Sequence, residues 1–232
     1  MNTEAVRKKN RHRKYHLFLQ QIKPTDHEKI LDVGFANREY SDVDNYLEKN
    51  DPYPSRITAL GIDDSDIFQQ RYPSVEVVCY DGKTFPFSDG QFDVGWSNAV
   101  IEHVGDEEAQ VYFLKELCRT CKRVYFTTPN RYFPFELHTR LLFIHWLPKR
   151  IFDYILSFTS KKWATGNYMY LLSIRKLKKI LKKAGITNYH IFKNRFCGLT
   201  MDFSIVIPSN NVIPAQAGIL YTILQPIVSP LL

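Results

Sequence analysis

The segment from residue 30 to residue 128 alternates short apolar runs with amphipathic stretches, and this alternation constrains the fold more than any other feature. The apolar runs predict strands over 30–35, 57–63, 75–80, 92–97 and 123–128. The amphipathic stretches predict helices over 38–49 and 106–121. Buried strands that alternate with helices favour a parallel sheet covered on both faces. The handedness of crossovers then predicts a doubly wound, Rossmann-like α/β fold.

The flanking segments extend this pattern. A polar helix is predicted over 3–21, a second helix over 173–184, and strands near 189–193 and 202–207. Residues 129–170 are irregular and rich in aromatics, which is typical of a lid or substrate insertion. We therefore expect one domain over 1–207, with a basic helix within 1–27 and the lid at 129–170, followed by a Pro-interrupted apolar tail over 208–232. The four prolines and a turn signal favour a docked or disordered tail over a membrane span.

Charge and cysteine content bear on partners and compartment. The chain has 31 basic and 24 acidic residues, a net charge of +7, and the excess is concentrated in 7–14 and 175–183. Such clusters either contact nucleic acid, anionic lipid or an acidic substrate, or form solvated helix faces. No apolar signal segment follows the basic start, and four cysteines in 232 residues fit a reducing compartment, so we expect a cytoplasmic protein.

Acidic residues lie near the ends of three successive predicted strands: Asp32 is beside the turn after the first, Asp63 closes the second and Asp81 closes the third. Ligands of doubly wound sheets bind at the carboxyl ends of the strands, so these side chains are expected at one crevice. A carboxylate accepts two O–H donors from a ribose diol, and Gly34 permits close backbone approach. The segment after the first strand lacks the G-x-G-x-x-G that a dinucleotide-dependent dehydrogenase needs, which disfavours that class.

Four blocks carry a family resemblance: 30–34, 61–63, 81–93 and 97–104. In order and spacing they resemble the class I S-adenosylmethionine-dependent methyltransferases of the type 11 branch, over roughly residues 28–130. The resemblance implies a mostly parallel, seven-strand-type sheet, S-adenosylmethionine as cofactor, and cofactor-binding residues Asp32, Gly34, Asn37, Asp63, Asp81, Gly82 and Asn98. Ala36 and Arg38 depart from the family's glycine-rich loop. Ala99 replaces the first acid of the metal set of related enzymes, so no metal is expected.

Methyl transfer from a sulfonium depends chiefly on orientation and desolvation of the reactants. A hydroxyl acceptor would also need a base, for which His103 and His138 are the candidates, although either could be a structural imidazole. We expect methyl transfer to a small-molecule, lipid-linked or saccharide acceptor, at oxygen. The alternative is a non-catalytic module that keeps the fold and binds nucleic acid or membrane, with peripheral membrane contact through the basic faces and the apolar tail.

Overall fold

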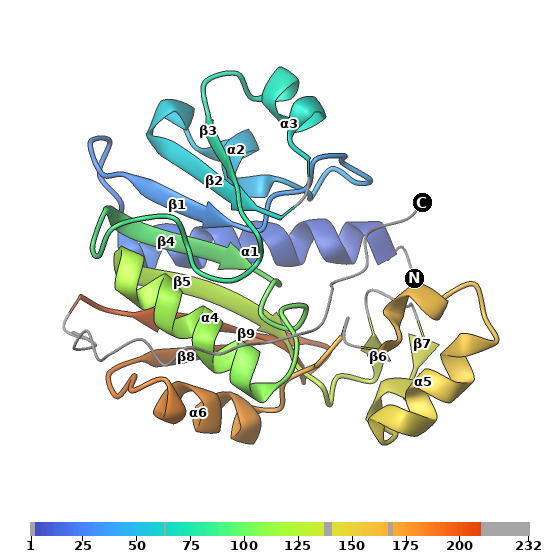
Figure 1. Cartoon of the computed structure of the whole chain (residues 1–232). Helices are drawn as coiled ribbons and strands as arrows, with labels where there is room; N and C mark the ends of the chain where they lie inside the picture. The colour runs from blue at the N-terminus through green and yellow to red at the C-terminus, as the bar shows by residue number, and fades with distance from the viewer. Residues whose placement is uncertain (1–2, 63, 137–140, 167–168, 210–232) are drawn as a thin grey trace.

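The computed structural model describes residues 3–209, apart from 63, 137–140 and 167–168. Its centre is a seven-stranded sheet in the order β3-β2-β1-β4-β5-β9-β8 (Figure 1). All pairs among the first five strands of this order are parallel, whereas β9 pairs antiparallel with β5 and β8. The strands are β1 Ile30–Val33, β2 Ile57–Gly61, β3 Glu76–Cys79, β4 Phe92–Asn98, β5 Cys121–Pro129, β8 His190–Phe196 and β9 Leu199–Ile207. The predicted doubly wound, mostly parallel sheet is confirmed.

Helices cover both faces of this sheet. Strand residues alternate between the faces, so Ile30 packs with α1 and α2, while Leu31 and Val33 pack with α4 and α6. Figure 1 shows α4 and α6 in front of the sheet and α1 behind it. The helices are α1 Thr3–Ile22, α2 Tyr46–Asn50, α3 Asp66–Arg71, α4 Glu107–Thr120, α5 Lys149–Ser157 and α6 Ile174–Lys183, with 3-10 turns η1 Pro54–Arg56, η2 Ile144–Trp146 and η3 Lys162–Ala164.

The helix predicted over 38–49 is wrong for its first eight residues, which form turns and bends before α2. The carboxylate of Asp44 accepts hydrogen bonds from the backbone N–H groups of Tyr40 and Ser41, and Asn45 has a left-handed φ of 46°. Short polar side chains that bond to nearby backbone offer it an alternative to the helix.

The segment 129–170, predicted as irregular, contains a compact subdomain that we call the lid. A small hairpin of β6 Phe135–Glu136 and β7 Leu141–Leu142 precedes α5. The lid has its own apolar cluster, separate from the two that flank the sheet. Figure 1 places the lid beyond the carboxyl ends of the parallel strands.

The second basic cluster forms α6, an amphipathic surface helix as predicted. Leu177, Ile180 and Leu181 are buried against the sheet. Lys179 and Lys183 form ion pairs with Glu107 at 2.9 and 2.5 Å, and these lysines lower the pKa of Glu107 to about 2. Part of this charge is therefore neutralised within the protein itself.

Candidate functional site

The parallel pairing of β1 to β4 brings their carboxyl ends to one edge of the sheet. The predicted residues Asp32, Gly34, Asp81, Gly82 and Asn98 follow or close three of these strands, so they share that edge. Asp63 and His138 lie outside the described residues.

Gly34, directly after β1, occupies a position that no other residue fits. Its φ is +101°, and a Cβ built on it would lie 2.3 Å from Val100 Cγ2. Its N–H donates to the Leu60 carbonyl at 2.8 Å, which fixes the turn against β2. Glycine is therefore required here by the positive φ and by close packing against Val100.

The loop after Gly34 is held by side-chain amides instead of further glycines. Asn45 brackets Ala36, because its Oδ1 accepts from the Ala36 N–H and its Nδ2 donates to the Ala36 carbonyl, both at 2.8 Å. Asn37 Oδ1 accepts from the N–H groups of Ile67 and Phe68 at 3.0 Å and so caps α3. The side-chain oxygen of Asn37 is therefore engaged within the protein. A contact of Asn37 with the cofactor would have to use its amide nitrogen, and this role stays a prediction.

Asp32 forms a buried acidic pair with Glu48 of α2. Both side chains are about 5 % exposed, and both Glu48 carboxyl oxygens are buried without a hydrogen bond that meets normal geometry. Burial, followed by the neighbouring Glu48 carboxyl, raises the pKa of Asp32 well above its ordinary value, while Arg11 lowers it. Burial also raises the pKa of Glu48. Such a pair has a strong electrostatic preference for a cationic group.

We expect Glu48→Gln to stabilise the ligand-free protein by about 1–2 kcal/mol at pH 8. The folded protein holds the proton of a raised-pKa carboxyl to a higher pH than the unfolded chain does. Stability therefore falls as pH rises from the ordinary pKa through the raised one, and the variant removes part of this loss. Urea unfolding of both proteins at pH 5 and pH 8 measures the effect. A difference that does not grow with pH would contradict it.

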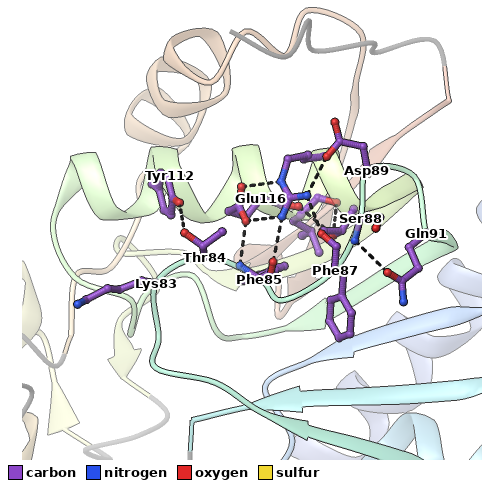
Figure 2. Close-up of polar contacts among 12 residues, drawn as sticks. Lys83, Thr84, Phe85, Phe87, Ser88, Asp89, Gln91, Tyr112 and Glu116 are labelled. Atoms are coloured by element: carbon purple, nitrogen blue, oxygen red, sulfur yellow. Dashed lines mark hydrogen bonds and ion pairs between the residues drawn. The ribbon is translucent and has the colours of Figure 1, made fainter. Parts of the chain in front are cut away.

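Asp81 and Gly82 begin an exposed loop after β3. Asp81 Oδ1 accepts from the Lys83 N–H at 3.0 Å, and Gly82 has a φ of 78°. The following residues are fastened to α4 by Glu116 and Arg119, as Figure 2 shows for Glu116. Glu116 Oε2 accepts from the Phe85 N–H at 2.9 Å and pairs with Arg119 at 2.7 Å.

Arg119 completes this clamp. Its guanidinium donates to the carbonyls of Phe85 and Phe87 and pairs with Asp89 at 2.8 Å. Sequence reasoning missed both clamp residues, because nothing in their spacing distinguishes Glu116 and Arg119 from a surface i,i+3 pair. The clamp explains physically why the 81–93 block has a fixed shape.

The end of β4 is tied to β5 and to the lid. Thr127 Oγ1 donates to Asn98 Oδ1 at 2.8 Å, and Ala99 adopts a left-handed φ of 61°. Glu102 is fully buried, accepts from Thr128 Oγ1 at 3.1 Å, and lies 3.9 Å from His103 Nε2. His103 is thus positioned at this edge, although its role as a base stays a prediction.

The family model for the methyltransferase domain of type 11 matches residues 31–124, which contain all of these strand ends. Residues 31–124 are therefore similar to the methyltransferase domain of the type 11 branch. The enzyme class of the chain is S-adenosylmethionine-dependent methyltransferase. No curated protein matches the chain.

Solved structures share the methyltransferase fold. An S-adenosylmethionine-dependent methyltransferase from Mesorhizobium loti is 12 % identical with a TM-score of 0.54, and the match covers 83 % of this chain and 96 % of that one. The N-terminal domain of EvdMO1, crystallised with SAH and D-fucose, is 17 % identical with a TM-score of 0.54, covering 86 % and 82 %. A phosphoethanolamine N-methyltransferase from Haemonchus contortus is 13 % identical with a TM-score of 0.52, covering 78 % and 39 %. Identities this low show the fold alone.

The strand-end residues of the methyltransferase fit S-adenosylmethionine. The orphaned carboxyl oxygens of Glu48, beside Asp32, suit the α-ammonium of the methionine part. The Gly34 turn, fixed by a φ of +101° and by packing against Val100, follows Asp32 at the same strand end. The family assignment and these two observations agree on the cofactor.

The basic stretch of α1 covers the methyltransferase sheet instead of facing solvent throughout. Lys14 is buried and pairs with Asp202 of β9 at 3.3 Å, and Asn10 and Asn194 donate to the same carboxylate at 2.5 Å. Burial lowers the pKa of Lys14, and Asp202 partly offsets this. Of the two interpretations of the basic cluster 7–14, a contact patch or a solvated helix face, neither applies to Lys14.

Proposed function

We propose that the enzyme transfers a methyl group from S-adenosylmethionine to the oxygen of a small-molecule, lipid-linked or saccharide acceptor in the cytoplasm. The observation that carries the cofactor part is the buried Asp32–Glu48 pair beside the Gly34 turn. The acceptor part is supported by the lid, which lies at the same edge of the sheet (Figure 1). We further propose a single domain over 1–207; most of the apolar tail, 210–232, lies outside the described residues.

Each strand end has a distinct task in this proposal. Burial keeps a proton on the Asp32 and Glu48 carboxyls in the ligand-free protein, and they release it when a cationic amine takes its place. Asp63 accepts from the ribose hydroxyls, and Asp81 with Gly82 flanks the adenine. Asn98 borders the methyl group, which the bound sulfonium supplies. His103 or His138 removes the acceptor's proton.

The lid contacts the β4 loop directly. The Tyr170 N–H donates to the Glu102 carbonyl at 2.8 Å, and buried Gln110 donates to the carbonyls of Ile101 and Tyr170 at 3.1 and 3.0 Å. An acceptor held by the lid would therefore lie beside the Glu102-His103 pair. This contiguity supports methyl transfer over a non-catalytic binding role.

Among the three proposed kinds of acceptor, a lipid-linked one is favoured by an exposed apolar stripe on the lid. Ile151 and Tyr154 of α5 and the adjoining Phe158 recur at helical spacing and are 48–75 % exposed, on the side opposite the buried Phe152 and Leu156. The same segment carries exposed Arg150 and Lys162 and half-buried Lys161. Aromatic and basic side chains together are typical of interfacial contact with anionic lipid. No helix in the described part of the chain is long and apolar enough to cross a membrane.

Calorimetric titration with S-adenosylhomocysteine tests the cofactor part of the proposal. We expect binding by the wild type and a loss of about 1.5–3 kcal/mol in Asp63→Ala, because a carboxylate that bonds ribose makes charge-assisted hydrogen bonds. Asp64→Ala, which changes an exposed neighbour, is the matched control and should bind as the wild type does. No binding at millimolar ligand would overturn the proposed function, and equal affinities would remove Asp63 from its role.

A further inference from the structure

A cavity of about 70 Å³ lies between the lid and the first turn of α6. Its described lining contains three cationic side chains and no carboxylate: Arg131, Lys149 and Lys176. A volume this small suits one functional group rather than a whole acceptor, since complete ligand sites are several-fold larger.

The two lysines approach one aromatic ring in this cavity. Lys149 Nζ and Lys176 Nζ lie 5.6 and 5.8 Å from the centroid of the Tyr170 ring. Lys149 pairs with Asp153 at 2.5 Å, whereas Lys176 forms no ion pair with any residue in the described ranges. Burial lowers the pKa of Lys176, and Arg131 adds to this effect while Glu107 opposes it. Clustered cations of this kind repel one another unless an anion lies among them.

The first turn of α6 adds positive potential to the same place. Ser173 caps the helix, with its Oγ accepting from the Lys176 N–H, and no acidic residue occupies the first turn. The N-terminal end of a helix carries partial positive charge, so a lysine there is unfavourable on its own. An oxyanion at this position would offset both charges.

A buried histidine contributes an unused polar atom. His145 lines the cavity, is 6 % exposed, and its Nε2 lies 2.8 Å from the Phe133 carbonyl, to which it must donate. Its Nδ1 is buried and makes no hydrogen bond of normal geometry within the described part of the chain. Burial lowers the pKa of His145, while the Phe133 and Arg131 backbone and Glu136 oppose this effect. In an uncharged ring that donates through Nε2, Nδ1 is an acceptor. It can therefore accept from an O–H group.

We propose that this cavity binds an oxyanion group of the methyl acceptor, a phosphate or a carboxylate, through Arg131, Lys149 and Lys176, with His145 Nδ1 accepting from an adjacent O–H. The inference rests on the proposed function, because it assigns the cavity to the acceptor. The geometry connects the two sites, since the cavity residue Tyr170 is hydrogen-bonded to Glu102 beside His103.

Calorimetric titration of the full chain with inorganic phosphate, in a phosphate-free buffer, tests the cavity without methyl transfer. We expect millimolar binding by the wild type and about tenfold weaker binding by Lys176→Met and by Arg131→Gln. Lys176→Arg should retain most of the affinity because it keeps the charge. Lys178→Met, which removes an exposed lysine of the same helix, should bind as the wild type does. Equal phosphate affinity in all four variants would overturn the inference.

Two further measurements distinguish a failure of the cavity inference from a failure of the proposed function, and a lipid headgroup from a free oxyanion. S-adenosylhomocysteine binding is measured on the same samples: if it is retained while phosphate binding is absent, the cavity inference fails and the proposed function stands. Phosphate binding without cofactor binding would leave the cavity as an oxyanion site and overturn the proposed function. Co-sedimentation with phosphatidylcholine vesicles containing phosphatidic acid identifies the source. Weaker sedimentation of Lys176→Met supports a lipid headgroup, and unchanged sedimentation with weaker phosphate binding supports a free oxyanion.

Discussion

Replacing Arg119 with Met is expected to lower the free energy of unfolding by about 3–5 kcal/mol. The Glu116 side chain is only 8 % exposed, and the substitution leaves its carboxylate buried without its cation. The hydrogen bonds that Arg119 donates to Glu116 raise the pKa of Arg119, so the guanidinium remains charged in the clamp. The carbonyls of Phe85 and Phe87 also lose their donor. Urea unfolding with an unchanged m-value measures the loss.

Two variants make this result interpretable. Lys122→Met breaks an ion pair with Asp93 that is 59 % and 28 % exposed, so it should cost no more than about 1 kcal/mol. Adding Glu116→Gln to Arg119→Met removes the buried charge and should restore part of the stability. If Arg119→Met costs no more than Lys122→Met, the clamp is not a structural element of the 81–93 block.

Asp202→Ala should destabilise the protein by a similar amount, about 3–5 kcal/mol, because Lys14 would remain buried without its carboxylate. The loss should depend on pH. Burial lowers the pKa of Lys14, so the folded protein releases this proton at a lower pH than the unfolded chain. Stability therefore rises with pH between the two pKa values, and removing Asp202 lowers the folded pKa further and widens that window.

Thermal unfolding of wild type and Asp202→Ala between pH 7 and pH 10 checks this prediction, with the gap between them expected to narrow as pH rises. Lys9→Met, an exposed change on the same helix, is the control and should have little effect at any pH. A stability difference between the two proteins that stays constant from pH 7 to pH 10 would show that the pKa of Lys14 does not change on folding.

The inner parallel strands could be predicted because they contain short apolar runs, as in 57–61, which is buried along its whole length. The six-residue α3 was missed because so short a helix leaves almost no periodic signal. The lid helix α5 was missed for another reason: apolar residues occur on both its buried and its exposed side, so no single face stands out.

From the sequence, the candidate site could be located only to the carboxyl ends of the parallel strands. Asp32 was expected at the crevice, but its buried partner Glu48 lies in a segment whose fold depends on local side-chain bonds. The ion pair between Lys14 and Asp202 joins residues 188 positions apart, and no spacing rule reaches that far. The cavity beside Tyr170 combines residues from three separate segments of the chain, so only the tertiary structure could reveal it.

The anchoring of α1 on β9 also bears on how the protein is made. The first helix emerges from the ribosome long before the strand that carries Asp202, so Lys14, Asn10 and the apolar side of α1 must wait for it in water. The β5–β9 pairing can likewise form only after the lid and α6 have been synthesised. Completion of the sheet is therefore expected only after β9 has left the ribosome, and until then the segment before it keeps apolar surface that chaperones bind.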